Sequence, residues 1–310
     1  PAAGPKAPGR HRLNALLPDA TERLARAGSE PARLVAAVLL AHGLGIDRSG
    51  LVAHPETVLS TGQQQTYEAC VMRREAGEPV AYIRGLKEFY GSAISVDARV
   101  LIPRPETEAL VELALARITA DLTRVQRERD EPYLVWDIGT GSGAIPVAMA
   151  LELRRRRYGE AVHFFVSDIS SDARDVATLN VVAHGLAHLF TFAEGDLTEV
   201  TPTPTGPVDL VVANLPYIPA AMVPNLPVAA SFEPADALDG GPDGLDVIRR
   251  LLPRAPEIVA PGGALLLEIG SDQGEAITSA AAEALPLWRC TIYPDLSGSH
   301  RVAELERPGA

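Results

Sequence analysis

The chain has 310 residues, 46% of them hydrophobic, so it is long enough for one large domain with its own core and a second small one. Its two cysteines cannot form a disulfide framework, and no apolar run is long enough to cross a bilayer, so a reducing cytoplasm is the expected location. The formal net charge of −12 is concentrated in residues 105–310, which carry 15 basic against 30 acidic residues. A domain of that sign is a poor match for nucleic acid, so we expect no stable nucleic-acid complex and no membrane association.

The first 85 residues carry a helical pattern. Residues 1–11 are rich in Pro, Ala and Gly, so a disordered tail is expected there. Over residues 12–85, apolar residues recur at helical spacing, which predicts a small helical domain. Ser29 is the expected N-cap of one helix, and another helix is expected over residues 61–75. This domain has no residues at catalytic spacing, so its expected role is substrate recognition.

Residues 86–104 are expected to link the helical domain to the rest of the chain as a β-hairpin. Apolar residues alternate over 89–96 and resume over 99–102, which places the turn at Asp97 and the residue after it. A helix is expected over residues 106–118, with acidic side chains in its first turn.

Residues 105–310 alternate between apolar strands and helices. This alternation predicts an α/β domain with a Rossmann-like, mostly parallel sheet of seven strands that is covered by helices on both faces. The strands are expected at 132–138, 162–168, 188–193, 208–213, 263–269, 288–293 and 301–306. The helices are expected near 143–156, 171–184, 245–258 and 272–284. Polar stretches at 121–131 and 199–206 resemble insertions, and ligands are expected at the carboxyl ends of the strands.

The first strand of this sheet runs into a glycine-rich turn. The residues of the turn are Asp137, Ile138, Gly139, Thr140, Gly141, Ser142 and Gly143. Glycine lets the backbone approach a ligand closely, and the following helix directs its N-terminal N–H groups into the crevice. Gly139, Gly141 and Ala144 also fit the loose G-x-G-x-x-A pattern of dinucleotide-binding folds. Asp137 and Gly143 favour S-adenosylmethionine instead, because Asp137 would meet its ammonium group directly or through water.

Acidic residues also end the next two strands. Asp168 ends the second strand and is suited to accept hydrogen bonds from both ribose hydroxyls of a nucleoside. Ser170 and Ser171 are better placed to cap the helix that follows. Asp196 and Leu197 end the third strand and are suited to hold the adenine amino group and ring. With the glycine turn, these residues make three successive contacts to the expected cofactor.

The tetrapeptide that ends the fourth strand is the candidate catalytic motif. It consists of Asn214, Leu215, Pro216 and Tyr217. An amide or aromatic amine nitrogen is a poor nucleophile because its lone pair is delocalised. The Asn214 side-chain oxygen and the Leu215 carbonyl would accept its N–H groups and stabilise positive charge as a methyl group arrives. Pro216 would rigidify the turn, Tyr217 would offer an aromatic wall, and Asn214 is also expected to contact the cofactor.

Three other charged or metal-ligating clusters carry weaker signals. His184 and His188 have helical spacing but lack a glutamate between them, so no metal site is expected. The aspartates between 236 and 246 lack calcium-loop spacing and are expected to be a solvated loop over the site. The arginines at 154–157 are expected to solvate the end of a helix, where cations complement the helix dipole.

With these residues in place, the sequence closely resembles the release factor glutamine methyltransferases over nearly all of residues 12–308. The family-specific part is the stretch Leu101-Ile102-Pro103-Arg104-Pro105-Glu106-Thr107-Glu108. The other shared motifs include Glu88-Phe89-Tyr90-Gly91, the glycine turn, Phe232-Glu233-Pro234, Asp239-Gly240-Gly241-Pro242-Asp243-Gly244-Leu245, Glu268-Ile269-Gly270 and Asp295-Leu296-Ser297-Gly298. The resemblance implies methylation of the side-chain nitrogen of the glutamine in the Gly-Gly-Gln loop of class I peptide-chain release factors. S-Adenosylmethionine would be the donor, the helical domain and hairpin would grip the factor, and a monomer is expected.

One position departs from the family pattern. The family tetrapeptide is Asn-Pro-Pro-Tyr, whereas Leu215 stands at its second position here. Asn-Leu-Pro-Tyr is typical of ribosomal RNA adenine dimethyltransferases, but Leu215 keeps the backbone carbonyl and the acidic domain lacks the basic surface that RNA requires. A ribosomal-protein glutamine methyltransferase and an adenine N6-dimethyltransferase stay open as alternatives. A binding module that has lost catalysis would be expected to lack one of the two hydrogen-bond acceptors of the tetrapeptide. Asn214 is present, so this alternative is disfavoured.

Overall fold

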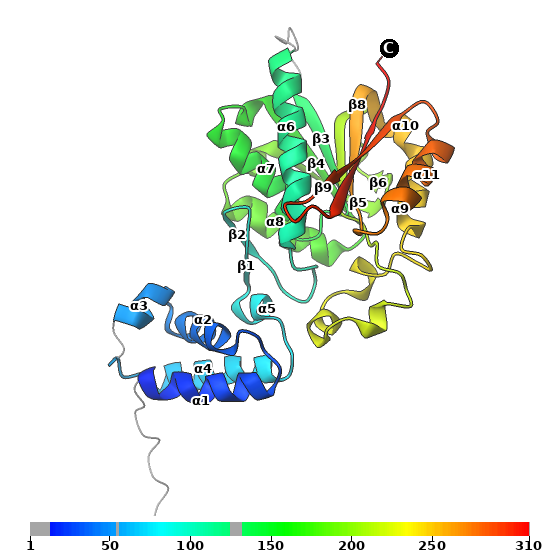
Figure 1. Cartoon of the computed structure of the whole chain (residues 1–310). Helices are drawn as coiled ribbons and strands as arrows, with labels where there is room; N and C mark the ends of the chain where they lie inside the picture. The colour runs from blue at the N-terminus through cyan, green and yellow to red at the C-terminus, as the bar shows by residue number, and fades with distance from the viewer. Residues whose placement is uncertain (1–12, 54–55, 125–131, 310) are drawn as a thin grey trace, which may run out of the picture. The chain divides into compact units, whose positions relative to one another are not determined.

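The computed structural model describes residues 13–53, 56–124 and 132–309. The chain divides into two compact units (Figure 1). The smaller unit holds the chain up to Leu86 together with Pro227–Phe232, and the larger unit holds Lys87–Leu226 and the chain from Glu233 onwards. The predicted tail at 1–11 and the stretch from 125 to 131 lie outside the described residues. No helix in the described ranges is both long enough and apolar enough to span a membrane.

The smaller unit is helical. Its helices are α1 (Leu13–Arg26), α2 (Ala32–Leu44), α3 (Arg48–Ala53), α4 (Thr61–Glu75) and α5 (Val80–Arg84). Helix α4 begins with a capping box, in which the Ser60 hydroxyl accepts from the Gln63 backbone N–H and the Gln63 side-chain oxygen accepts from the Ser60 N–H. The predicted N-cap at Ser29 is wrong, because α2 begins after Pro31 and Ser29 is buried before it.

The segment Pro227–Phe232 packs within the smaller unit, although it lies more than 140 residues beyond Leu86 in the chain. Gly77 has a φ of 95°, and a Cβ atom at this position would lie 2.6 Å from the Val228 side chain. Only glycine therefore fits the point where this segment meets the turn after α4.

The hairpin forms, but its turn lies earlier than predicted. Strands β1 (Leu86–Phe89) and β2 (Ser92–Ser95) make a two-stranded sheet around Tyr90 and Gly91. Both turn residues have positive φ, 46° and 69°, as a type I′ turn requires. The Tyr90 N–H donates to a Glu108 carboxylate oxygen at 2.9 Å, and its hydroxyl donates to Glu112 at 2.6 Å. These carboxylates hold a tyrosine where asparagine is the usual residue.

The larger unit is built on a central sheet (Figure 1). This sheet has eight strands in the order β6-β5-β4-β3-β7-β8-β10-β9. Its strands are β3 (Tyr133–Ile138), β4 (Val162–Asp168), β5 (Phe190–Asp196), β6 (Glu199–Thr201), β7 (Val208–Ala213), β8 (Val259–Glu268), β9 (Arg289–Pro294) and β10 (His300–Glu306). The sheet is parallel from β5 to β8, and β6, β10 and β9 run antiparallel to their neighbours. The predicted Rossmann-like α/β fold is confirmed. The short edge strand β6 lies in the polar stretch 199–206, where no strand was predicted.

Helices cover this sheet, with one departure from the predicted pattern. The helices and 3₁₀ turns are η1 (Pro105–Thr107), α6 (Glu108–Arg124), α7 (Ala144–Arg155), η2 (Gly159–Ala161), α8 (Ser171–Ala183), η3 (Ala187–Leu189), η4 (Val223–Asn225), η5 (Val228–Phe232), η6 (Ala235–Ala237), α9 (Asp246–Leu251), η7 (Leu252–Arg254), α10 (Ala255–Ile258) and α11 (Gly274–Ala284). The single helix expected at 245–258 is wrong, because three short pieces, α9, η7 and α10, take its place. Pro253 and Pro256 lie at the starts of the second and third pieces, and proline lacks the N–H that a continuous helix needs.

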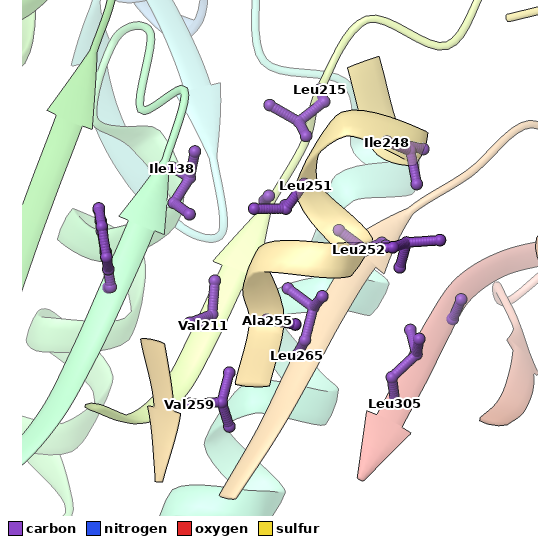
Figure 2. Close-up of a cluster of buried hydrophobic side chains, with 14 of the residues drawn as sticks. Ile138, Val211, Leu215, Ile248, Leu251, Leu252, Ala255, Val259, Leu265 and Leu305 are labelled. Atoms are coloured by element: carbon purple, nitrogen blue, oxygen red, sulfur yellow. The ribbon is translucent and has the colours of Figure 1, made fainter. Parts of the chain in front are cut away.

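A hydrophobic core joins the sheet to these short helices (Figure 2). Val211 on β7 and Leu265 on β8 are fully buried against Leu251 and Leu252. Both strands are apolar on both faces, as expected for parallel strands in a covered sheet. Leu215, from the candidate tetrapeptide, packs into the same cluster and is 5% exposed. Its side chain is therefore anchored in the core while its backbone remains at the sheet edge.

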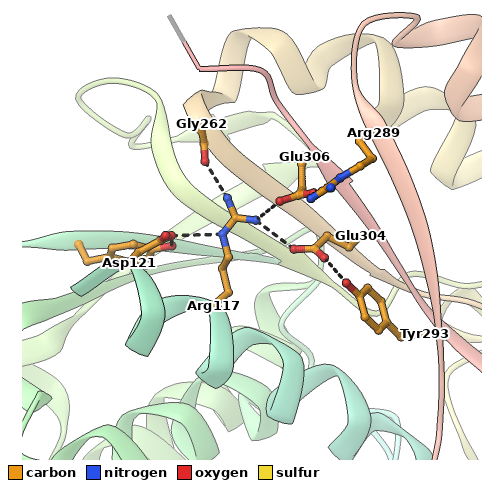
Figure 3. A network of polar contacts seen from close by, with 8 residues as sticks. Arg117, Asp121, Gly262, Arg289, Tyr293, Glu304 and Glu306 are labelled. Atoms are coloured by element: carbon orange, nitrogen blue, oxygen red, sulfur yellow. Dashed lines mark hydrogen bonds and ion pairs between the residues drawn. The ribbon is translucent and has the colours of Figure 1, made fainter. Parts of the chain in front are cut away.

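A polar network joins α6 to strands β8 and β10 (Figure 3). The Arg117 guanidinium donates to Glu304 at 3.0 Å, to Glu306 at 2.8 Å and to the Gly262 carbonyl at 2.7 Å. Glu304 also accepts from the Tyr293 hydroxyl at 2.9 Å. Arg117 also pairs with Asp121 at 3.2 Å and is 15% exposed, so its removal would leave three carboxylates poorly hydrated and without their shared cation.

Arg117→Met should therefore destabilise the larger unit. Because the remaining carboxylates would be left partly buried and close together, we expect the free energy of unfolding to fall by about 1–3 kcal/mol. Arg155→Met is the matched control, since Arg155 is 62% exposed and its pair with Glu152 should contribute no more than about 1 kcal/mol. Urea unfolding of both variants measures the difference, and equal effects would contradict the role of the network.

Candidate active site

A cavity of about 380 Å³ lies at the carboxyl ends of β3, β4, β5 and β7. Strand β3 pairs with β4 on one side and with β7 on the other, so the strand order reverses at this point. Ligands of open α/β sheets bind in the crevice at such a reversal, and the volume is in the range of small-molecule sites. The cavity lies entirely within the larger unit.

The glycine turn forms one wall of this cavity. Gly139, Gly141 and Gly143 have φ values of 73°, 54° and 75°, in the left-handed region that favours glycine. A Cβ atom at Gly143 would lie 3.2 Å from the Ala177 backbone, so this glycine also lets α7 approach α8 closely. Gly143 immediately precedes α7, and that helix directs its N-terminal N–H groups toward the cavity.

Asp168 lines the cavity at the end of β4. Its two oxygens accept from the Gly141 N–H at 2.8 Å and from the Ser170 N–H at 2.9 Å. Burial raises the pKa of Asp168, and these backbone donors oppose the rise. Ser170 rather than Asp168 caps α8, since its hydroxyl accepts from the Ala173 N–H. A carboxylate has about four acceptor sites, so two remain for a ligand.

Asp196 and Leu197 line the cavity at the end of β5. Asp196 forms an ion pair with Arg250 from α9, and Arg250 also lines the cavity. Leu197 has a φ of 53°, a conformation that is uncommon for residues other than glycine. Sequence reasoning missed Arg250, because its helix lies far along the chain and carries no motif.

Asp137 is fully buried beneath the glycine turn, with 0% exposure. Neither of its carboxylate oxygens has a partner at hydrogen-bond geometry among the described residues. Burial raises the pKa of Asp137 to about 7, an effect that the nearby Thr140 hydroxyl offsets only partly and the Asp168 charge increases. Asp137 is not among the described residues that line the cavity. A cationic ligand above the turn would supply the positive charge that this carboxylate lacks.

The candidate tetrapeptide follows β7. Asn214, Leu215 and Pro216 line the cavity, whereas Tyr217 is not among the described lining residues. The Asn214 side-chain nitrogen donates to the Thr107 hydroxyl at 3.3 Å. The Tyr217 hydroxyl donates to a Glu268 carboxylate oxygen at 3.1 Å, and the side-chain nitrogen of Gln273 donates to the Tyr217 carbonyl at 2.9 Å. Residues from two distant segments, Thr107 in one and Glu268 and Gln273 in the other, thus hold the motif.

A further ion pair joins the cavity wall to the loop after β7. Arg104, which lines the cavity, donates to the Glu233 carboxylate at 2.5 Å, and the Glu233 side chain is 2% exposed. Burial raises the pKa of Glu233, while the Arg104 charge and hydrogen bond oppose the rise. Sequence reasoning assigned no role to either residue, although both lie in motifs of the family resemblance.

These features fit S-adenosylmethionine, and with the strand order they define a Rossmann-like methyltransferase that depends on this cofactor. Within the described ranges, no group of three or more His, Cys, Asp or Glu side chains is arranged to hold a metal. Residues 15–85 match the family model of the PrmC N-terminal domain. The fold is similar to that of the hMettl16 catalytic domain solved with a MAT2A 3′UTR hairpin, with a TM-score of 0.52 and 13% identity, covering 81% of this chain and 83% of that one.

The curated relatives identify the family more narrowly than the fold does. The chain is 40% identical over 289 residues to the release factor glutamine methyltransferase of Moorella thermoacetica, covering 93% of this chain and 96% of that protein. It is 39% identical over 286 residues to the enzyme of the same name from Bradyrhizobium diazoefficiens, covering 92% and 91%. The chain belongs to the release factor glutamine methyltransferase family.

The buried Asp137 predicts a pH-dependent stability. Its folded-state pKa of about 7 lies above the ordinary value of 3.8. Its contribution to the free energy of unfolding is therefore fully present below pH 3.8 and is lost as the pH rises through 7. Asn cannot ionise, so the free energy of unfolding of Asp137→Asn should depend less on pH than that of the wild type. When the pH is raised from 5 to 8, the wild type should lose about 2–3 kcal/mol more of this free energy than the variant. Urea unfolding at the two pH values measures this, and equal losses would rule out the explanation.

Proposed function

We propose that the protein methylates the side-chain nitrogen of the glutamine in the Gly-Gly-Gln loop of class I peptide-chain release factors. Family membership supports this proposal, since the relatives are named for that reaction. The observation that carries it is that Asn214 and Leu215 line the same cavity as Asp168 and the glycine turn. Candidate acceptors for a substrate amide and candidate contacts for the cofactor therefore share one space.

The residues proposed to hold the cofactor are those at the strand ends. Asp168 would accept from the ribose, Asp196 and Leu197 would hold the adenine, and Asp137 would compensate the positive charge of the methionine part. The turn residues Gly139 to Gly143 and Asn214 would complete the contacts. Bound S-adenosylmethionine supplies an electrophilic methyl group.

The tetrapeptide is proposed to activate the glutamine nitrogen. The Asn214 side-chain oxygen and the Leu215 carbonyl would each accept one N–H of the amide. Two acceptors in this arrangement draw the nitrogen toward a tetrahedral geometry and stabilise the positive charge that develops there. Pro216 restricts the backbone of the turn. Leu215 performs the role of the usual proline through its backbone, while its side chain anchors the turn in the core.

The smaller unit is proposed to recognise the protein substrate. We assign residues 1–11 to a tail, 12–85 to the recognition domain, 86–104 to a hairpin linker and 105–310 to the methyltransferase domain, except that Pro227–Phe232 packs with the recognition domain. Because release factors act on ribosomes, the proposed location is the cytoplasm, and the proposed active species is a monomer that forms no stable nucleic-acid complex.

Variants of the tetrapeptide should separate binding from chemistry. Asn214→Ala removes an acceptor that acts on the developing charge, so methyl transfer should fall by about 10²–10³. Cofactor affinity should change far less, because Asn214 is only one of the proposed cofactor contacts and the strand-end aspartates and the glycine turn remain. Leu215→Pro keeps the carbonyl and should remain active. Calorimetry and initial rates measure the two effects. An active Asn214→Ala variant together with an inactive Leu215→Pro variant would refute the assigned roles.

The choice of acceptor tests the proposed function directly. The enzyme and labelled S-adenosylmethionine are mixed with a class I release factor, its Gly-Gly-Glu variant, ribosomal proteins and ribosomal RNA, and labelled peptides are mapped. Glutamate lacks both N–H donors, so the Gly-Gly-Glu variant should be methylated at least about 10⁴-fold more slowly than the intact factor. Label should appear only on the glutamine of the intact factor. Label on adenine would favour an RNA dimethyltransferase, and label on a ribosomal protein would favour the related glutamine methyltransferases.

A further inference from the structure

A buried carboxylate behind the tetrapeptide has no role in the function described so far. Glu268, the last residue of β8, is 1% exposed. Its Oε1 atom accepts from the Tyr217 hydroxyl at 3.1 Å, and its Oε2 atom is buried without a partner at full hydrogen-bond geometry among the described residues. Burial of an ionisable group is costly, so its position beside the candidate motif calls for an explanation.

Thr107 lies between this carboxylate and Asn214. It ends the turn η1 just before α6 and is 3% exposed. Its hydroxyl oxygen accepts from the Asn214 side-chain nitrogen at 3.3 Å. Burial raises the pKa of Glu268, whereas hydrogen bonding to Thr107 and Tyr217 and the charge of Arg301 oppose the rise. The Thr107 hydroxyl thus accepts from the Asn214 amide and lies near enough to Glu268 to lower the pKa of that carboxyl, although no Thr107–Glu268 contact reaches full hydrogen-bond geometry among the described residues.

Hydrogen-bond polarity then determines which way the amide faces. A hydroxyl has one hydrogen to donate, and a carboxylate can only accept. When Thr107 donates to Glu268, only its lone pairs remain for Asn214, so Asn214 must turn its NH₂ group to Thr107. The Asn214 oxygen is then the atom left on the cavity side. An amide turned the other way would present its own N–H groups to the N–H groups of the substrate.

We propose that Thr107 and Glu268 are positioning residues that fix the side-chain amide of Asn214 with its oxygen toward the substrate nitrogen. The proposal rests on the proposed function, because the orientation matters only if the substrate offers N–H donors. It gives a role to two motifs of the sequence, Glu268-Ile269-Gly270 and the stretch that ends at Glu108. The same carboxylate holds Tyr217 directly, so one buried charge orders both side chains at the ends of the tetrapeptide.

Two substitutions at Thr107 test this role. Thr107→Val preserves the shape and removes the hydroxyl, whereas Thr107→Ser preserves the hydroxyl. We expect kcat for release-factor methylation to fall about 10- to 100-fold in Thr107→Val with the KM for S-adenosylmethionine nearly unchanged, because only the orientation of an acceptor is lost. Thr107→Ser should retain most of the activity. Equal losses in both variants, or no loss in either, would overturn the proposal.

Thr119→Val is the matched control. Thr119 lies on α6, the helix that follows Thr107, and its buried hydroxyl has no hydrogen-bond partner among the described residues. The same change of side chain should therefore leave kcat as in the wild type. A loss in Thr119→Val as large as in Thr107→Val would assign the effect to the helix and overturn the proposal.

A double-variant comparison tests whether the two residues act through one route. Glu268→Gln replaces an acceptor-only group with an amide that can donate, which frees the Thr107 hydrogen to turn toward Asn214. Because both changes act on the same amide, Thr107→Val combined with Glu268→Gln should be no more than about threefold slower than the slower single variant. Losses that multiply would overturn the proposal. If Glu268→Gln fails to fold, the comparison of Thr107→Val with Thr107→Ser tests the proposal by itself.

The wild-type enzyme separates this proposal from the proposed function. Failure of the wild type to methylate a release factor would refute the proposed function itself. Normal wild-type activity with an unaffected Thr107→Val variant would refute only the positioning role.

Discussion

Parallel pairing of β3 with both β4 and β7 is the constraint on which the candidate site depends. Because these strands run in the same direction, their carboxyl ends meet at one edge of the sheet and bring together residues as far apart in the chain as Asp137 and Asn214. Asp168 is the last residue of β4, and the glycine turn and Asn214 directly follow β3 and β7. The apolar core beneath them keeps the strand ends in fixed register, and hydrogen bonds such as the one from the Gly141 N–H to Asp168 then orient the polar residues.

Acidic groups at this edge are kept away from water at a cost to stability. Burial raises the pKa of four carboxyl groups here and is the largest contribution in each case. These groups are Asp137, Asp168, Glu233 and Glu268. Backbone donors, an arginine or hydroxyl groups offset this cost at three of the four positions, whereas Asp137 has the weakest compensation. A site that binds a cation can tolerate such a group, because the ligand supplies the missing charge.

Much of the architecture is predictable from local pattern, because long apolar runs define the buried strands. Three strands of the parallel sheet, β3, β4 and β7, end where the sequence predicted, whereas β5 continues to Asp196 instead of ending at 193. The residues at these strand ends were recognised as candidates because they follow buried apolar runs. The errors arise where distant residues override local preference, as when Glu108 and Glu112 hold Tyr90 in a turn. The supporting side chains of the site could not be predicted, because their roles depend on segments that meet only in the folded chain. They are Arg104, Thr107, Glu233, Arg250, Glu268 and Gln273.

The smaller unit is not a continuous stretch of chain, since Pro227–Phe232 belongs to it while both neighbouring segments belong to the larger unit. The backbone therefore passes between the two units at three places. A fragment that ends at Leu86 would lack the residues that fill the space beside Gly77, and a fragment that begins at Lys87 would carry those residues with nothing to pack against. Exchange of the recognition unit between family members would accordingly require two grafts, one at the N-terminus and one inside the loop after β7.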